Sequence, residues 1–568
     1  MDTTEPNGRP RIGVAISGGG CRAACWGTGA LMGIVDAGVA HDVVSMSSVS
    51  GGSYTNAAVM EQGDFQRADR STLEKWFRPS LRQWAHDGLF FPGPLTDRWL
   101  GITLSWLVTG VAALVAAIVA TITAGRDPSL ADMLIASGIA TLPLVILFFL
   151  LAGKLMPTPF LKNAMRLPSL LTLPLTLGAM ALVAWNAWFL IAVIAIAVVK
   201  FVVALRRFGR RSAAVEEALA ITFPGTLADR RDRSVHHVFC TADLNTGNNL
   251  YLTNRMVWGA PDVHAKPGQI SVGLAAQTSS CLPGAFLARH FEELPTDPVT
   301  KASFTLSDGG VYDNMADQWE WGYPNRREQT EDLGCLDLLT DAQPHRADVL
   351  VVVNASRGMQ GRGNIVTNPG LRGELKSALA AKDVIYDVST TTRRRLLVDL
   401  FNRNAQNKRA DLTARSDQAD RHEDVGDLLD GMLVHIGSDP YALPFKFFKD
   451  PGPRGTRAQA ALKRLDQITD ELAPPTDEAE TMKEANARRR GLWKKIADRN
   501  AGVATTLAPL ESLDAGSTAS LLHHAWVLTR VGGWVLHDWR GASEHDLGDW
   551  RLSRFVEMVD ETRSAPKI

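Results

Sequence analysis

Two glycine- and serine-rich segments near the N-terminus have residue types suited to binding an anion and exposing a hydroxyl group. Residues 17–22 (SGGGCR) follow the apolar run 12–16, and residues 49–53 (VSGGS) follow Val43 and Val44. Both segments are therefore expected where a buried strand turns into a helix, with N–H groups exposed at the positive end of the helix dipole. Ser50 would stand on a tight elbow as a nucleophile. Together these features predict attack on a carbonyl carbon, with donors in place for the oxyanion.

A nucleophilic serine needs a base, and no histidine lies in a recognisable triad pattern. Asp308 does stand out, because it precedes Gly309 and Gly310 on a predicted exposed turn. Another turn is predicted at residues 279–286 (SSCLPGAF). An aspartate on such a turn is a candidate general base.

In chain order, G-G-G-x-R, the serine elbow, S-S-x-x-P and D-G-G resemble the motifs of the patatin-like phospholipases, and the first two are also similar to cytosolic phospholipase A2. The resemblance covers about residues 10–60 and 235–360. It implies a three-layer α/β/α domain and a Ser–Asp dyad that uses no histidine, metal or cofactor. Carried over by motif, it implies Ser50 as nucleophile and Asp308 as base. It also implies that Gly18, Gly19 and Gly20 donate to the oxyanion, and that Arg22 fixes their loop or meets a phosphate.

One position departs from the usual elbow, because Ser48 replaces the first glycine of G-x-S-x-G. Ser47, Ser48 and Ser53 therefore remain alternatives as nucleophile, although only Ser50 has two glycines directly behind it. Asp313 and Asn314 are expected to stabilise the turn after Asp308.

The glycine turn also allows another interpretation. Gly18-x-Gly20-x-x-Ala23 fits a dinucleotide-binding turn. That fold needs an acidic residue at the end of the second strand, where the second turn of this chain instead has a serine, Ser50, with glycines beside it.

Three stretches without charge, 99–125, 133–153 and 167–199, predict a membrane block. About 20 apolar residues cross a bilayer, so we expect four spans, at 102–124, 133–153, 167–184 and 186–205. Lysine and arginine on the flanking loops place the catalytic domain and both termini in the cytoplasm. Because the predicted spans lie between Ser50 and Asp308 in the sequence, an even number of spans also places both residues on the same side of the membrane.

The rest of the chain reads as an α/β domain. Strands are predicted at 12–16, 235–241, 269–274, 348–354 and 431–437, and a helix at 460–472. Arginines 393–395 open a charged stretch to about 421, interpreted as a solvated helical face or as a contact for anionic headgroups. The net charge of −1 gives no reason to expect a nucleic-acid partner.

The predicted organisation has four parts. Residues 10–98 and 212–390 form the two halves of a patatin-like domain, 99–206 form the four-helix transmembrane insertion, and 391–568 form a mostly helical C-terminal region. The predicted function is a membrane-anchored serine lipid acyl hydrolase, with membrane lipids as both substrate and anchor. The alternative is a noncatalytic membrane receptor or scaffold that retains a patatin-like shell.

Overall fold

A computed structural model shows the protein as two compact units. The larger contains residues 1–89, 219–509 and 513–568, and the smaller contains 90–218 and 510–512. The structure describes residues 9–86, 94–123, 188–229, 232–259, 263–283, 286–299, 303–343, 346–356, 390–403, 429–475, 480–503, 513–539 and 551–564, with short pieces of 135–178 and 380–388.

The larger unit is built around one mixed β-sheet, in the order β10-β9-β1-β2-β3-β4-β5-β6, with β8 also paired to β3 and β7 to β8. The parallel strands are β1 (Ile12–Ile16), β2 (Val43–Ser48), β3 (His236–Asp243), β9 (Val349–Asn354) and β10 (Asp430–His435). The antiparallel strands are β4 (Asn248–Thr253), β5 (Val257–Gly259), β6 (Val263–Ala265), β7 (Arg289–Phe291) and β8 (Phe304–Asp308). The predicted α/β class is confirmed.

The apolar strand sequences explain the centre of this sheet. β1 and β9 are buried along their whole length, as parallel strands covered on both faces require. From β1 the chain runs to β2 and β3 on one side, whereas β9 and β10 add on the other side. Open α/β sheets bind ligands outside the carboxyl ends of their strands where the order reverses in this way. The glycine turn follows β1 at this place.

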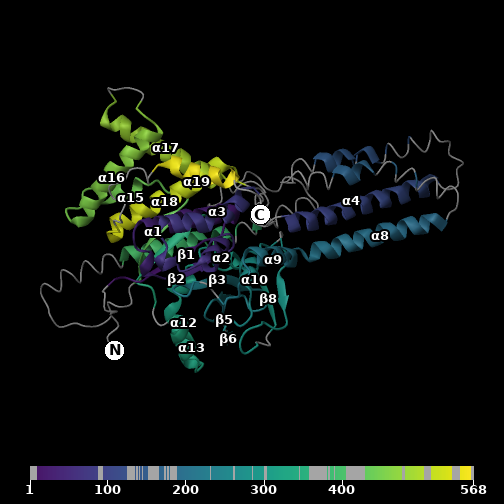
Figure 1. Ribbon diagram of the computed structural model, residues 1–568, viewed down its shortest axis with the longest axis horizontal. Helices are drawn as coiled ribbons and strands as arrows, with labels where there is room; N and C mark the ends of the chain where they lie inside the picture. The colour runs from purple at the N-terminus through teal and green to yellow at the C-terminus, as the bar shows by residue number, and fades with distance from the viewer. Residues whose placement is uncertain are drawn as a thin grey trace. The chain divides into compact units, whose positions relative to one another are not determined.

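Helices cover both faces of the sheet, giving three layers (Figure 1). On one face, α1 (Gly20–Asp36) packs against α18 (Ala515–His537), where a Cβ atom on Gly29 would lie 2.3 Å from the Leu522 carbonyl oxygen. The opposite face is covered by α11 (Gln318–Trp321), α12 (Tyr323–Asp332), α13 (Leu336–Ala342) and the helical residues 390–403. Their buried side chains include Trp319, Leu339 and Phe401. The C-terminal region, which supplies β10 and α18, therefore completes the same domain.

Most local predictions in this unit are confirmed, with two corrections. The predicted helix 460–472 lies in α16 (Pro453–Leu472). Residues 269–274 do not form a strand, because Ser271 caps α10 (Val272–Ser279) by accepting a hydrogen bond from Leu274 N at 3.0 Å. Arg393 is not on a solvated face, because it pairs with buried carboxylates. Residues 404–428 of the same charged stretch lie outside the described residues.

The smaller unit contains α4 (Pro94–Thr123) and α8 (Trp188–Gly209), packed side by side. Within the ranges that the structure describes, none of the helices combines the length and the apolar character that a bilayer crossing requires. The predicted four-span membrane protein is therefore wrong. The predicted membrane anchor, and the orientation with the catalytic domain and both termini in the cytoplasm, lose their basis with it.

The prediction failed because a stretch without charged residues shows only that the segment is apolar. It does not show whether the helix packs against lipid or against another helix. Lys200 of α8 donates to Thr109 Oγ1 of α4 at 3.2 Å, and Arg207 donates to Thr103 Oγ1 at 3.2 Å. These hydrogen bonds link α8 to α4. Ile122 of α4 and Trp188 of α8 remain exposed. About half of the residues of the predicted spans 133–153 and 167–184 lie outside the described residues.

Candidate active site

Ser50 lies on a sharp turn between β2 and α2 (Gly52–Gln62). Its φ angle is +52°, in the left-handed region that residues other than glycine rarely adopt. Such strain persists only where the surrounding structure imposes it, and it is often found at functional sites. The Ser50 N–H donates to the Ser279 carbonyl oxygen at 3.0 Å, which helps to hold the turn. The turn therefore has the shape of a nucleophile elbow with Ser50 at its bend.

The two glycines after Ser50 are required for close backbone contact. A Cβ atom on Gly51 would lie 2.1 Å from the Gly20 carbonyl oxygen, and one on Gly52 would lie 2.7 Å from the Ile16 carbonyl oxygen. Both distances are far inside van der Waals contact. The elbow and the glycine turn thus touch main chain to main chain, which no residue with a side chain would allow.

The glycine turn, residues 18–20, leads from β1 into α1. Gly19 has φ +142° and Gly20 has φ +61°, both positive values that glycine adopts without steric cost. The Gly18 N–H donates to the Asn314 carbonyl oxygen at 3.0 Å. The N–H groups of Gly19 and Gly20 have no hydrogen-bonding partner among the described residues. Of the three predicted oxyanion donors, Gly19 and Gly20 are therefore the two that the fold leaves available.

Arg22 extends from the first turn of α1 and is only 5% exposed. Its Nη1 donates to the Ala501 carbonyl oxygen of α17 (Met482–Gly502) at 3.0 Å. A Cβ atom on Gly19 would lie 3.4 Å from Nη2 of Arg22. The guanidinium therefore lies against the glycine turn that it was predicted to fix.

Asp308 is the last residue of β8 and the cap of a short 3₁₀ helix, Gly309–Val311. Its side chain is fully buried. Oδ1 of Asp308 accepts a hydrogen bond from Gly310 N at 2.8 Å. The main chain of the Asp-Gly-Gly turn thus holds the carboxylate in one orientation.

Strand β3 brings the serine and aspartate segments together. One edge of β3 is occupied by β4, so β2 and β8 share the other edge. Ser48 lies opposite Phe239, and Asp308 lies opposite Thr241. At about 3.3 Å per residue, these two positions are about 7 Å apart along β3. Ser50 and Asp308 are far apart in the sequence, but β2 and β8 end at neighbouring positions along β3 and bring the two residues into the same region.

Direct contact between the two turns supports this placement. A Cβ atom on Gly309 would lie 2.9 Å from Cγ2 of Val49, so the neighbours of Asp308 and Ser50 touch. The Ser50 hydroxyl forms no hydrogen bond with any residue that the structure describes, Asp308 included. Catalytic hydrogen bonds are often long before substrate binds and shorten in the complex.

The other serines of the elbow are already engaged. Ser47 Oγ donates to a main-chain carbonyl oxygen at 2.6 Å, and Ser48 Oγ donates to a carbonyl oxygen of β3 at 3.1 Å. Ser53 Oγ lies 2.8 Å from Ser279 Oγ. None of the three has a positive φ angle. The geometry therefore favours Ser50 over these alternatives, and Ser48 takes the place of the usual glycine without opening the turn.

Asn314 lies between the glycine turn and the Asp-Gly-Gly turn. From the sequence, we expected it only to stabilise the turn after Asp308. A Cβ atom on Gly18 would lie 2.3 Å from its Oδ1, and one on Gly310 would lie 2.8 Å from the same atom. Its Nδ2 donates to Ser356 Oγ at 2.9 Å and to Thr390 Oγ1 at 3.1 Å. Asn314 thus joins the glycine turn, the Asp-Gly-Gly turn, the end of β9 and the helical residues 390–403. Its position shortly after the Asp-Gly-Gly motif was the only sequence signal.

Two buried histidines form their hydrogen bonds with other groups than Ser50 or Asp308. His237 Nδ1 lies 2.6 Å from Asn56 Oδ1, and His524 Nε2 donates to the Ser438 carbonyl oxygen at 3.0 Å. Burial lowers the pKa of His524 to about 3, so this ring is neutral at pH 7. Within the described part of the chain, no histidine forms a hydrogen bond with Ser50 or Asp308. The role of Asp308 as the base, without a histidine, therefore stays a prediction.

A buried ion cluster lies directly after the Asp-Gly-Gly turn. Arg393 Nε lies 3.3 Å from Asp313 Oδ1 and 3.1 Å from Asp317 Oδ1. Burial, followed by the charge of Asp313, raises the pKa of Asp317 to about 7, although Arg393 opposes the shift. The cluster anchors the helical residues 390–403 against the loop that carries Asp308.

This raised pKa predicts a pH-dependent stability. Between pH 4 and 7 the folded protein binds a proton at Asp317 that the unfolded chain has released, so its stability falls as pH rises through that window. We expect Asp317→Asn to remove a slope of up to about 1.4 kcal/mol per pH unit. Urea unfolding of both proteins at pH 5, 6 and 7 measures it. Equal slopes for the two proteins would contradict the prediction.

Comparison with known proteins adds little to this geometry. No family model matches the chain, and no curated protein matches it. Among solved structures, this chain is similar to VipD from Legionella pneumophila, with 10% identity, a TM-score of 0.22, and coverage of 98% of this chain and 92% of that chain. A likeness this slight carries no argument about fold or function, so the proposals below rest on this chain's own residues.

Proposed function

We propose that the protein is a serine acyl hydrolase that cleaves carboxylic esters of lipids through a Ser–Asp dyad. The observation that carries the proposal is the strained elbow. Ser50, at φ +52°, lies beside a glycine turn with two available N–H groups, and the Asp-Gly-Gly turn lies next to the elbow on the same edge of β3. Lipid as the ester class follows from the resemblance of the four motifs to patatin-like phospholipases.

In the proposed reaction, Asp308 accepts the proton of the Ser50 hydroxyl while Oγ attacks the ester carbonyl carbon. The tetrahedral intermediate collapses as the alcohol leaves with the proton from Asp308, which leaves an acyl-serine. Water then attacks the acyl-serine while Asp308 takes a proton from it. The second tetrahedral intermediate collapses with release of the fatty acid, and Asp308 returns the proton to the leaving Ser50 Oγ. A hydrogen bond from Gly310 N–H orients the Asp308 carboxylate.

The developing oxyanion is assigned to the N–H groups of Gly19 and Gly20. Both belong to the turn that begins α1, so the helix dipole adds to their positive potential. Preorganised donors of this kind are worth about 3–4 kcal/mol each in the transition state. Gly18 takes a positioning role instead, because its N–H is bound to Asn314.

A fluorophosphonate probe tests the nucleophile. We expect the wild-type protein to form a covalent adduct on the peptide that contains Ser50, measured by mass spectrometry. Ser50→Ala should lose the adduct and release no fatty acid from acyl esters. Ser53→Ala is the matched control, because it removes a hydroxyl from the same helix start and should keep the label.

Circular dichroism of each variant establishes that its fold is intact. A wild-type protein that takes no label and hydrolyses no ester would overturn the proposal and favour a noncatalytic shell. A label that persists in Ser50→Ala but disappears in Ser53→Ala would keep the hydrolase and move its nucleophile.

A further inference from the structure

Four fully buried polar side chains connect the loop before β3 to the nucleophile elbow. Nε2 of His237 lies 3.2 Å from Oδ2 of Asp232, and Nδ1 of His237 lies 2.6 Å from Oδ1 of Asn56. Nδ2 of Asn56 donates to Oγ of Ser48 at 2.8 Å. Each of the four residues is 0% exposed. The proposed reaction uses none of them, yet this chain of hydrogen bonds ends two residues before Ser50.

The neighbours of Asn56 fix the orientation of its amide group. Nδ2 also donates to two main-chain carbonyl oxygens, that of Met46 at 3.0 Å and that of Val238 at 3.2 Å. Carbonyl oxygens can only accept, so the amide nitrogen must face them and Oδ1 must face His237. Because Oδ1 is itself an acceptor, Nδ1 of His237 must carry a proton.

Asp232 places a second constraint on the His237 ring. Its Oδ1 accepts from Ser234 N at 2.8 Å and from Ser234 Oγ at 2.7 Å, and its Oδ2 accepts from Phe65 N at 3.2 Å. Burial opposes ionisation of this carboxyl group, but the hydrogen bond and charge of His237, together with the bonds from Ser234 and Phe65, lower the pKa of Asp232 to about 2. An ionised carboxylate only accepts, so Nε2 of His237 must carry a proton as well.

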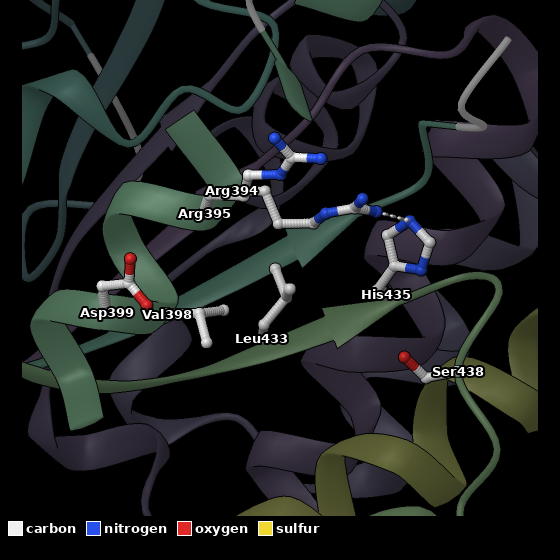
Figure 2. Close-up of a pocket in the computed structure, with 7 residues that line it drawn as sticks. All are labelled: Arg394, Arg395, Val398, Asp399, Leu433, His435 and Ser438. Atoms are coloured by element: carbon white, nitrogen blue, oxygen red, sulfur yellow. Dashed lines mark hydrogen bonds between the residues drawn. The ribbon is translucent and has the colours of Figure 1, made fainter. Parts of the chain in front are cut away.

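A second buried histidine shows how the facing group decides the charge of the ring. Figure 2 shows the Arg394 side chain reaching His435 at the wall of a cavity, where Nη1 of Arg394 lies 3.2 Å from Nε2 of His435. A guanidinium only donates, so this ring nitrogen must accept. Burial, followed by the charges of Arg394 and Arg22, lowers the pKa of His435 to about 4, and the ring is neutral at pH 7. His237 faces a carboxylate instead, so the opposite charge state follows.

We propose that His237 is a buried imidazolium and a positioning residue for Ser50, acting through Asn56 and Ser48. A charged donor forms shorter and stronger hydrogen bonds than a neutral one. The distance of 2.6 Å between His237 Nδ1 and Asn56 Oδ1 agrees with such a bond. The positioning role rests on the proposed hydrolase function, whereas the charge of His237 does not.

Ser48 links this chain of hydrogen bonds to both sides of Ser50. Its Oγ accepts from the Asn56 amide and lies 3.2 Å from Oγ of Ser53. Ser53 Oγ lies 2.8 Å from Ser279 Oγ, which accepts from Ser50 N at 3.3 Å. Contacts on both flanks hold Ser50 in its left-handed conformation. A glycine at position 48, as in the usual elbow, would remove this acceptor for Asn56.

Neutron crystallography of the perdeuterated wild-type protein at neutral pH tests the charge without any substitution. We expect deuterium on both ring nitrogens of His237, but not on both ring nitrogens of His435. Deuterium on only one nitrogen of His237 would overturn the imidazolium.

Ser48→Ala and His237→Gln test the positioning role. The kcat for an acyl ester is expressed per site that reacts with the fluorophosphonate probe after labelling to completion, which corrects for any loss of folded protein. Each variant should lower kcat about 10–100-fold with little change in KM, the cost of a misplaced nucleophile. The double variant should lose no more than the worse single variant, because both substitutions break the same chain of hydrogen bonds.

His236→Gln is the matched control. His236 is the neighbouring buried residue of β3, and its Nε2 lies 2.8 Å from Thr253 Oγ1. Losing this ring should lower stability but keep the wild-type kcat per labelled site. An equal loss of kcat in the control, an unchanged kcat in Ser48→Ala or His237→Gln, or single losses that multiply in the double variant would overturn the positioning role and leave the hydrolase standing.

A structural readout replaces kcat if the wild-type protein takes no label and cleaves no ester. The hydrolase would then fail, and the crystal structure of Ser48→Ala would decide the positioning role. We expect Ser50 to leave its φ angle of +52° when the Ser48 hydroxyl is removed. An unchanged φ angle would overturn the positioning role.

Discussion

Asp308→Asn is expected to lower kcat for ester hydrolysis by about 10²–10⁴-fold, the usual contribution of a general base. The amide oxygen of asparagine can keep the hydrogen bond from Gly310 N, so the turn should retain its shape. The amide has no basic oxygen to take the Ser50 proton. Steady-state kinetics with a chromogenic acyl ester measures the loss, and KM should change little because the substituted side chain acts on the reacting hydroxyl.

The control for this experiment is Asp243→Asn. Asp243 is also a buried carboxylate on the β3–β8 pair, and its Oδ1 accepts from Thr305 N at 3.0 Å, a bond that asparagine preserves. It should keep wild-type kcat, because it lies on β3 rather than on the turn. If both variants lost activity equally, or if Asp308→Asn stayed fully active, Asp308 would not be the base.

Gly51→Ala is expected to destroy the elbow. The new Cβ atom would lie 2.1 Å from the Gly20 carbonyl oxygen and 2.7 Å from Gly20 N, both main-chain atoms that have no side-chain freedom to move away. We expect a loss of unfolding free energy of more than about 3 kcal/mol, because forced overpacking of a buried turn exceeds the usual range. Fluorophosphonate labelling should disappear even in the fraction that folds.

Gly491→Ala is the matched control, and we expect this glycine-to-alanine substitution to raise the free energy of unfolding rather than lower it. Gly491 lies inside α17, and apart from its chain neighbours and the backbone of its own helix, no atom lies within 4 Å of the position that its Cβ would take. Alanine should therefore stabilise the protein by about 0.5–1 kcal/mol through its helix propensity. Thermal and urea unfolding of both variants measure the contrast. A Gly51→Ala protein as stable and as readily labelled as Gly491→Ala would refute the close approach of the two turns.

The local chemistry of the site could be predicted because short segments carry their own structural requirements. The apolar runs at 12–16 and 348–354 lie in the buried strands β1 and β9, and Gly51 and Gly52 are where the elbow demands them. Other elements lacked such a signal. β5 and β6 have three residues each, too few for an alternating pattern to emerge. Residues 269–274 look apolar enough for a strand, yet the Ser271 cap starts a helix there.

The amino-acid sequence by itself determined the α/β class, the two turns and the residue types that could perform ester hydrolysis. These depend on neighbours along the chain, such as glycine where φ must be positive or where two main chains touch. Only the tertiary structure decided that Gly18 N–H is bound to Asn314, that Arg393 is buried between carboxylates, and that α8 packs on α4. Each of these outcomes depends on a partner tens to hundreds of residues away, which no local pattern records.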